Sequence, residues 1–585
     1  MRVVCSLGIL PLILFFTIPA HAVGSLRATT TDDFPYTYSS TGQRVRLSNP
    51  ISADDYLVTA RCGSSYLALN SAGKKLLYLQ GNAMERGYAE GYLCPRGVYR
   101  MTHDFVENFI AGLVGAPMND TARKVVTSTV RKIMTRAVLS QEHAVPEEYR
   151  LEMQGIARGA QDRGYDVRYQ DLFLLNVGFD FLYSLIYQGG SLLCNEFSVF
   201  GRGTTDGRLY HGRDFMFTTG GDVFSDEALI MVHVPTAGNP FAAPAAPGFV
   251  GVPTGLNSKG VSFGMDMVPN RQNRPLISGM GCLLLCREVL QKAGSLQEGI
   301  EIVRNTSRGV SWLFMIADGK IPDAVVLETV ADRAVPQGDE LLATLAGLLP
   351  GLGNVLMGLE NITGVELQDG AGNVITGMGD LALASTEILP VIGDVHPDRG
   401  VAVRASDYQD PDGLEQYRLV IRCRDPLVPK SEVTEISPFP LQIERKPDLI
   451  AMTNHYILPR MNLTQMGLFY HTIDTQQGGG RESEWRYKTM LGPILSCYGH
   501  IDRLTAMWLI DFLNPARCDY YGTDTAQSVK GHHVLMDNRS LEIWSLHGYY
   551  DEPWQHVNLK KLISTGPSGL SGGSWKKRGP KATAY

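Results

Sequence analysis

Two amphipathic stretches dominate the pattern of hydrophobic and polar positions in the first third of the chain. Residues 122–138 (ARKVVTSTVRKIMTRAV) and 147–164 (EEYRLEMQGIARGAQDRG) both place apolar side chains at helical spacing, with polar loops between such stretches. The pattern from residue 23 to residue 193 therefore predicts a mainly helical segment.

The pattern changes at Cys194, after which short apolar runs rich in β-branched and aromatic residues alternate with turns. Asp206 and Gly207 form a D-G hairpin signal between two of these runs. A helical stretch follows at 282–293, and Ser295 is a predicted N-cap that forms a capping box with Glu298. Strands mixed with packed helices predict an α+β fold. The predicted strands lie at 197–203, 208–215, 228–235, 261–268, 314–319 and 324–329.

A Gly- and Leu-rich insertion occupies about residues 331–400. Pro350, Gly351 and Gly353 break its apolar runs, so it is not a membrane-spanning helix. We expect an inserted helical hairpin packed on the core; the alternative is a lid or a lipid-contacting surface. Residues 569–585 are rich in Gly, Ser and Lys and are predicted to form a flexible tail.

The first 22 residues have the pattern of a secretory signal peptide. Arg2 precedes an apolar run at 7–18, and the small residues Ala20 and Ala22 follow it. Cleavage after Ala22 would give a secreted or periplasmic protein with no integral membrane span. The length of 585 residues predicts one large unit with an appendage, or two domains.

Composition excludes several classes of partner. The formal net charge of -7 provides no basic stripe for nucleic acid. The chain has no C-x-x-C pair, H-E-x-x-H motif or phosphate-binding glycine loop, so we expect no metal and no cofactor. Cys282 and Cys286 lie on one face of a predicted helix and are expected in the core. The spacing of the cysteines leaves the disulfide connectivity open.

The chemistry-bearing segment is SLLCNEFSVFGRGTTDGRLYHGRDFMF, residues 191–217. Cys194 opens a strand, and the return strand of the hairpin carries Arg213 and Asp214, which can therefore lie near the cysteine. A thiol beside a guanidinium has a lowered pKa and a larger thiolate population. Taken alone, the segment favours an inert buried cysteine over a catalytic one, because buried cysteines in β-strands are common and more often inert.

This segment resembles the processing site of the acyl-coenzyme A:6-aminopenicillanic acid acyltransferase family of N-terminal-nucleophile (Ntn) hydrolases, which is related to conjugated bile acid hydrolases and acid ceramidase. Further similar patterns follow in the family's order along most of the chain. They are LYLQGNAMERGYAEGYL (77–93), EMQGIARGAQDRG (152–164) with FLLNV (173–177), GVPTGLNSKGVSF (251–263), MTNHY (452–456) and SEWRYKTM (483–490).

The resemblance implies a four-layer αββα sandwich, with a mainly helical prodomain or α chain at 23–193 and a catalytic β chain at 194–568. It implies self-cleavage of the Leu193–Cys194 bond, after which the new α-amino group serves as base beside the thiol. It also assigns roles to four further residues. These are Arg213 near the nucleophile, Asn257 in the oxyanion hole, Asn454 holding the α-amino group or substrate amide, and Arg486 completing the polar network.

Each assignment has an ordinary alternative. Asn257 and Asn454 could be turn residues, and Arg486 could be a surface cation. His455 would suit a papain-like Cys-His-Asn arrangement, but the mid-chain position of the cysteine does not. The family has Asn after the arginine and Asp two positions later. This chain has Asp214 and then Met216. Asp214 is therefore the candidate to take over the role of that carboxylate through a small shift of the strand; the alternative is a differently tuned site, because neighbouring strand residues face opposite sides.

The leading hypothesis is hydrolysis or acyl transfer at a linear amide bond through a Cys194 thioester. The substrate would be a small acyl amide, possibly lipid-like, and the α and β chains would stay associated after cleavage. An ester hydrolase on the same fold is the second hypothesis, favoured if the insertion contacts lipid. A non-catalytic scaffold that binds acyl ligands is the third, motivated by Met216.

Overall fold

The computed structural model describes residues 50–114, 120–185, 194–216, 221–268, 279–331, 366–368, 374–375, 400–408, 420–424, 433–436, 446–458, 461, 473–474, 480–511, 531–548 and 552–566. The predicted signal peptide, Leu193 and the C-terminal tail lie outside these ranges. Of the insertion's interior, the structure describes only β12 (Glu366–Gln368) and β13 (Val374–Ile375), so the predicted helical hairpin also lies outside them.

The larger of two main sheets has ten strands in the order β1-β2-β3-β6-β7-β8-β9-β10-β11-β14. Only β3 and β6 pair in parallel, and every other neighbouring pair is antiparallel. The strands are β1 (Leu57–Cys62), β2 (Ser65–Leu69), β3 (Lys75–Gly81), β6 (Leu229–Pro235), β7 (Phe241–Ala245), β8 (Thr254–Asn257), β9 (Val261–Met267), β10 (Trp312–Asp318), β11 (Asp323–Thr329) and β14 (Val401–Ala405).

The second sheet has six antiparallel strands in the order β17-β4-β5-β20-β21-β22. They are β17 (Leu449–Met452), β4 (Asn195–Gly201), β5 (Gly207–Met216), β20 (Gly531–Asp537), β21 (Glu542–His547) and β22 (Gln555–Asn558). Apolar side chains of the two sheets share two buried clusters: Ile230 and Val534 belong to one, and Leu313 and Leu209 belong to the other. The sheets therefore bury a common interior.

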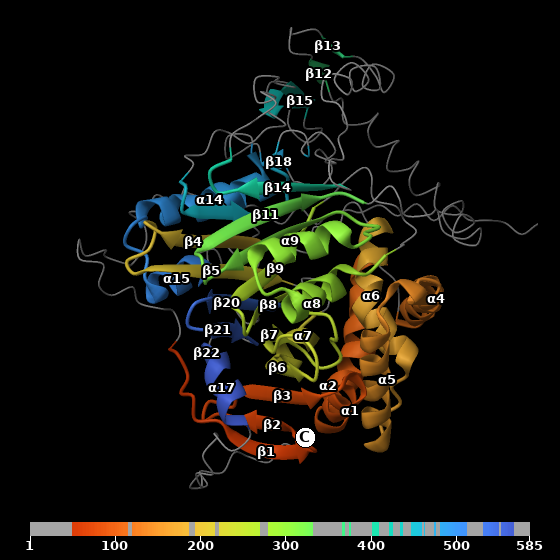
Figure 1. Cartoon of the computed structure of the whole chain (residues 1–585). Helices are drawn as coiled ribbons and strands as arrows, with labels where there is room; N and C mark the ends of the chain where they lie inside the picture. The colour runs from red at the N-terminus through yellow and green to blue at the C-terminus, as the bar shows by residue number, and fades with distance from the viewer. Residues whose placement is uncertain are drawn as a thin grey trace, which may run out of the picture.

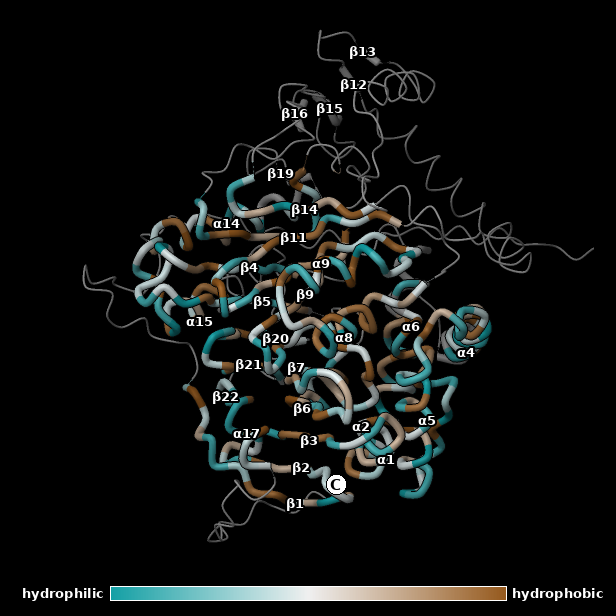
Figure 2. The backbone as a smooth tube through the Cα atoms, viewed as in Figure 1, coloured by the Kyte–Doolittle hydropathy of each residue, from teal (hydrophilic) through white to brown (hydrophobic). Residues whose placement is uncertain are grey.

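Helices lie against both sheets (Figure 1). α8 (Cys282–Lys292) contacts β8 and β9, and α9 (Leu296–Asn305) contacts β10 and β11. On the six-stranded sheet, α14 (Glu482–Ser496) contacts β17, and α15 (Arg503–Asp511) contacts β5 and β20. The hydrophobic positions of the strands, brown in Figure 2, lie mainly in the interior, whereas helices such as α4 and α5 alternate brown with teal.

A group of helices from the first part of the chain lies at one side of the sheets, at the right in Figure 1. It contains α1 (Ala83–Leu93), α2 (Pro95–Arg100), a π-helical turn (Met101–Phe105), α3 (Val106–Val114), α4 (Asp120–Leu139), α5 (Glu147–Asp162) and α6 (Tyr169–Leu185). No helix in the described ranges combines the length and apolar composition that crossing a membrane requires.

The predicted elements have mixed outcomes. The two amphipathic stretches form α4 and α5, and the six predicted strands form β4, β5, β6, β9, β10 and β11. Ser295 accepts a hydrogen bond from the Glu298 backbone N–H at 3.3 Å, which confirms the N-cap, but the Glu298 carboxylate accepts from Gly294 instead of closing a capping box. Residues 57–81 form three strands that the helical prediction for 23–193 missed.

The glycines quoted in the helical motifs let α1 and α5 approach closely. A methyl group on Gly87 would lie 2.0 Å from the carbonyl oxygen of Glu152, and one on Gly159 would lie 2.2 Å from that of Tyr88. Only a residue without Cβ fits at such a crossing. Close packing of these helices explains the glycine spacing and places Glu152 and Arg86 at a buried contact.

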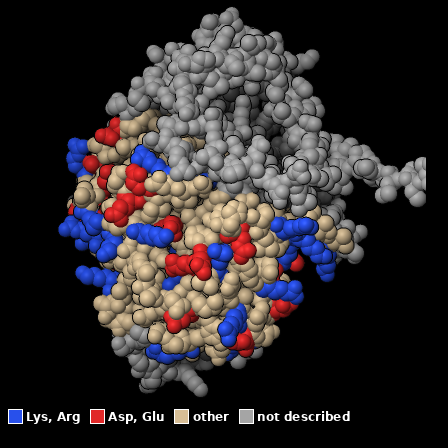
Figure 3. All heavy atoms as spheres, turned by 45° about the vertical axis from the view of Figure 1, so that its right-hand side comes forward, with Lys and Arg blue, Asp and Glu red and all other residues tan. Residues whose placement is uncertain are grey.

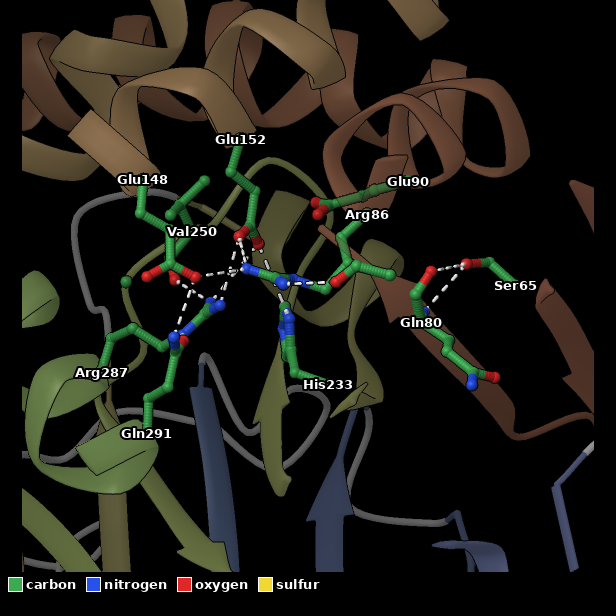
Figure 4. Close-up of polar contacts among 12 residues, drawn as sticks. Ser65, Gln80, Arg86, Glu90, Glu148, Glu152, His233, Val250, Arg287 and Gln291 are labelled. Carbon is green, nitrogen blue, oxygen red and sulfur yellow. Dashed lines mark hydrogen bonds and ion pairs between the residues drawn. The ribbon is translucent and has the colours of Figure 1, made fainter. Parts of the chain in front are cut away.

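The buried carboxylate of Glu152 joins the N-terminal helices to the later part of the chain (Figure 4). It accepts from Arg86 on α1 at 2.6 Å and from Arg287 on α8 at 3.2 Å, and all three side chains are at most 1% exposed. His233 on β6 lies 3.6 Å from the same carboxylate. Two guanidinium groups from opposite sides of residue 193 thus share the Glu152 carboxylate, and Arg86 also pairs with Glu148 at 3.0 Å.

We expect Glu152→Ala to lower the free energy of unfolding by about 3–5 kcal/mol, because it leaves two buried guanidinium groups without their shared counter-charge. Urea unfolding followed by circular dichroism measures the change. Glu301→Ala is the matched control, since Glu301 is 48% exposed and its partners, Arg304 and Gln297, lie on the same exposed helix surface. Equal losses in the two variants would contradict the role given to Glu152.

A pH effect follows from Glu90 on α1, which accepts from the Gly248 N–H at 2.6 Å. Burial raises the pKa of this carboxyl to about 8, and the Gly248 hydrogen bond only partly opposes it. The folded protein therefore keeps a proton that the unfolded chain releases near pH 4.3. The stability from that proton is complete below about pH 4.3 and is lost as the pH rises through about 8.

We expect Glu90→Gln to remove this part of the pH dependence, because glutamine does not ionise. The melting temperature of the wild type should fall relative to that of the variant between about pH 4.3 and pH 8. Above about pH 8 the difference between the two melting temperatures should stay constant. Thermal melts across this range measure the difference. Glu107→Gln, at a 54% exposed side chain, should track the wild type.

Candidate functional site around Cys194

The backbone of Cys194 is held by two side chains from distant parts of the chain. Cys194 directly precedes β4, and its N–H donates to the side-chain oxygen of Asn454 at 3.2 Å. Arg486 on α14 donates from Nη1 to the carbonyl oxygen of Cys194 at 2.6 Å and from Nη2 to the same Asn454 oxygen at 2.8 Å. These bonds close a ring around the cysteine, and all three residues are at most 1% exposed.

Local structure explains this arrangement. β17 pairs with β4 and ends at Met452, so Asn454 follows two residues later beside the start of β4. The Asn454 amide donates to the carbonyl oxygen of Met267 on the other sheet at 2.7 Å, which fixes the orientation of its oxygen toward Cys194. Arg486 is fully buried, so it is not the surface cation that was its alternative interpretation.

Arg213 lies on β5 and is fully buried between the sheets. Its guanidinium donates to the carbonyl oxygens of Pro253 and Met265 and to the Thr254 hydroxyl. Nη2 also lies 3.3 Å from Asp266, and Nε lies 3.6 Å from Glu196.

The electrostatic surroundings keep Arg213 positively charged. Burial by itself lowers the pKa of this guanidinium, but the acidic groups around it, first Glu196 and then Asp266 and Cys194, raise it above its usual value. Cys194 therefore lies within the electrostatic reach of a positive charge, as the hairpin predicted.

The Asp214 side chain lies on the face of β5 opposite to that of Arg213. Its carboxylate accepts from the Asn195 amide at 3.2 Å and lies 3.2 Å from Nε2 of His533 on β20. Asn195 in turn accepts from Arg486 at 2.7 Å. Asp214 thus supports the residue next to Cys194, away from Arg213, as the alternation of a strand requires. The predicted role of a carboxylate beside Arg213 does not fit this position.

Asn257 is not brought to Cys194 by any of its hydrogen bonds. Its amide nitrogen donates to the carbonyl oxygens of Leu290 and Ala293, at 2.9 and 2.7 Å, and its oxygen accepts from the backbone of the β8–β9 turn. Both amide hydrogens are used in fastening this turn to the end of α8. These bonds agree with the turn interpretation of Asn257, and its oxyanion-hole role stays a prediction.

Polar side chains of β9 and of the β4–β5 hairpin form a row of contacts that was not predicted from the sequence. Ser262 lies 2.7 Å from His211, whose other ring nitrogen contacts Glu196 at 2.5 Å, and Asp266 contacts Arg213. Between them, a methyl group on Gly264 would lie 1.8 Å from a Glu196 oxygen. The signal was present as V-S-F-G-M-D-M at 261–267, where polar or small residues alternate with large apolar ones.

His455, the alternative histidine, bonds through Nδ1 to the hydroxyls of Thr453 and Ser483 at 3.0 and 2.9 Å. Cys282 and Cys286 are buried on α8 and not disulfide-bonded, in agreement with their predicted core position. Among the described residues, no group of three or more His, Cys, Asp or Glu side chains is placed to bind a metal ion. On the face drawn in Figure 3, basic and acidic side chains are interspersed.

Comparisons with known proteins give one clear sequence relative. An uncharacterised protein from Archaeoglobus fulgidus is 33% identical over 523 residues, which cover 87% of this chain and 69% of that protein. No family model matches the chain.

Solved structures give weaker likenesses. An N-acylethanolamine-hydrolyzing acid amidase ortholog from Caenorhabditis elegans aligns with a TM-score of 0.28 and 9% identity over 59% of this chain and 93% of that one. A mutant conjugated bile acid hydrolase from Clostridium perfringens aligns with a TM-score of 0.29 and 10% identity over 63% and 93%. TM-scores this low do not establish a shared fold, so the contacts around Cys194 carry the argument about chemistry.

We expect Arg486→Lys to lower the free energy of unfolding by about 2–4 kcal/mol, because an ammonium group cannot span the Cys194 carbonyl and the Asn454 oxygen together. Urea unfolding measures the loss. Arg202→Lys is the control, because the Arg202 side chain is 76% exposed and its pairing with Asp448 is easily replaced. Equal stability of Arg486→Lys and the wild type would contradict the closed ring around Cys194.

Proposed function

We propose that this chain, which belongs to the same family as the Archaeoglobus fulgidus protein, is a self-cleaving cysteine hydrolase of the Ntn class that acts on a linear amide bond. The observation that carries the proposal is the ring formed by Cys194, Asn454 and Arg486. It fixes the cysteine backbone on both sides at the point where a new N-terminus would be created. A buried structural cysteine needs no such support.

Self-cleavage would begin with attack of the Cys194 sulfur on the carbonyl carbon of Leu193. The carbon–nitrogen bond breaks, the Leu193 acyl group moves to sulfur, and the freed Cys194 nitrogen takes up a proton. Water then hydrolyses the thioester, which releases the Leu193 carboxylate and restores the thiol. The Asn454 oxygen, which already accepts from the Cys194 nitrogen, would hold the resulting α-amino group.

The same centre would then process a substrate. The α-amino group, with a reference pKa of about 7.7–8.0, takes the thiol proton, and the sulfur attacks the amide carbon. The amine leaves with a proton while the acyl group forms a thioester, and water or another acceptor removes the acyl group. The positive charge of Arg213 favours the thiolate. The substrate class that fits this chemistry is a small acyl amide.

Contacts across residue 193 support lasting association of the two chains. β3 pairs with β6, Glu152 binds Arg287, and the Asp180 carboxylate accepts from the Cys282 N–H at 3.0 Å. Asn176 bonds to the backbone at 248, 250 and 251. None of these contacts requires an intact bond before Cys194.

The proposal extends to the fold and the location of the protein. Two facing sheets with α8 and α9 on one and α14 and α15 on the other support an αββα sandwich. The signal-like sequence at 1–22 supports export to a secreted or periplasmic location.

The decisive experiment is the intact mass of the purified protein and of its Cys194→Ala and Cys194→Ser variants. We expect the wild type to give two fragments that meet at Leu193–Cys194 and Cys194→Ala to give one chain, because alanine has no nucleophile. Cys497→Ser is the matched control, since Cys497 is buried directly after the end of α14 and lies outside the ring; it should still cleave. A wild type that stays a single chain while it hydrolyses an acyl amide would contradict self-cleavage.

A panel of acyl amides and the corresponding esters tests the substrate class. We expect release of amine from the amides by the wild type and an acyl thioester on Cys194, neither of which Cys194→Ala should give. Preference for the esters would favour the ester hydrolase, and no release from either class would favour the binding scaffold.

A further inference from the structure

Asp266 is a buried carboxyl group that the mechanism above does not use. It lies on β9, is fully buried, and faces the six-stranded sheet. One carboxyl oxygen is 3.3 Å from Nη2 of Arg213, and the other has no hydrogen-bond partner among the residues that the structure describes. An unsatisfied buried carboxyl oxygen costs stability unless the group has a further role.

The neighbours of Asp266 on β9 connect it to the Cys194 site from two directions. The carbonyl oxygen of Met265 accepts from Arg213, and that of Met267 accepts from Asn454. Arg213 interacts electrostatically with Cys194, and Asn454 bonds to the Cys194 backbone. A change at Asp266 therefore reaches the cysteine through β9 and Arg213.

Two carboxyl groups compete for the one guanidinium of Arg213. A chain of hydrogen bonds leads to Glu196. The Asn538 amide donates to the Ser262 hydroxyl at 2.7 Å, and Ser262 contacts His211, whose other ring nitrogen contacts Glu196. This order lets Ser262 donate to Nδ1 of His211 and leaves Nε2 to donate to Glu196. Oε1 of Glu196 thus has the His211 donor in addition to its proximity to Arg213, whereas Asp266, within the described part of the chain, has only the guanidinium of Arg213. The second oxygen of each carboxyl group, Oε2 of Glu196 and Oδ2 of Asp266, has no hydrogen-bond partner there.

We propose that Asp266 is a positioning residue of the Cys194 site, which as a neutral acid holds Arg213 against β9 and leaves the guanidinium charge to Glu196 and a Cys194 thiolate. The thiolate part of this proposal rests on the proposed function. The role of Asp266 differs from the predicted one of Asp214, which lies on the other face of β5.

The surrounding charges agree with a neutral Asp266. Burial raises the pKa of its carboxyl well above the usual value; Arg213 and Arg486 oppose this, and Glu196 and Asp214 add to it. On β20, burial and the Arg213 charge hold the pKa of His532 well below its usual value, so that ring adds no positive charge near neutral pH. When Asp266 ionises at higher pH, a third negative group competes for Arg213 and disfavours the thiolate.

The test is a titration of the Cys194 thiolate by its ultraviolet absorbance, with the absorbance of the Cys194→Ser counterpart subtracted at each pH. We expect the wild-type thiolate to form in two steps, because its ionisation is coupled to that of Asp266. In Asp266→Asn, which keeps the shape and cannot ionise, we expect a single step that is complete about one pH unit lower. Asp318→Asn is the control: this 5% exposed carboxyl at the end of β10 should leave the two steps unchanged.

Identical titrations of the wild type and Asp266→Asn would overturn the proposal. If Asp266→Asn does not fold by circular dichroism, the wild-type curve decides: two steps support the proposal and one step overturns it. The titration needs neither cleavage nor a substrate, so a protein that fails to cleave or to hydrolyse amides still gives a separate answer about Asp266. Where cleavage occurs, its rate should fall at high pH in the wild type and stay constant in Asp266→Asn.

Discussion

The burial of the Arg213 guanidinium between two sheets is the constraint on which the candidate site depends. An unpaired positive charge there would cost several kcal/mol, so both sheets must supply oxygen atoms to it. The hairpin supplies Glu196, and β8 and β9 supply two carbonyl oxygens, a hydroxyl and Asp266. Satisfying one cation thereby sets the register of the two sheets against each other at the position of Cys194.

A comparable constraint acts at the junction with the N-terminal helices. Glu152 is reached by guanidinium groups from α1 and α8, and the close glycine contacts of α1 and α5 hold it in place. The two buried ionic centres have different compositions. At Glu152 two cations share one carboxylate, whereas at Arg213 one cation has two carboxyl neighbours and a thiol. An excess of acidic groups around one cation makes their protonation interdependent.

Much of the site could be predicted from ordered motifs. Cys194, Asn454 and Arg486 are distant in sequence, and the structure joins them in one ring, while Arg213 lies where the hairpin predicted. The bonds that fasten Asn257 to the end of α8 could not be foreseen, because a motif match does not reveal where an amide is bonded. Asp266 and Glu196 were missed because a carboxylate in an apolar strand has no distinctive local pattern beyond the alternation at 261–267.

The sequence by itself determined the features that follow from its hydrophobic periodicity. These are helices α4 and α5, the strands after Cys194, and the placement of Arg213 and Asp214 on opposite faces of β5. Each of them depends only on residues that are neighbours along the chain. Only the tertiary structure decided which carboxyl groups face Arg213, that residues 57–81 extend a sheet, and that Asn257 fastens a turn. Those features depend on pairing between strands far apart in sequence, and many pairings satisfy the same local pattern. The burial of charged groups, each of which needs a partner, distinguishes between them.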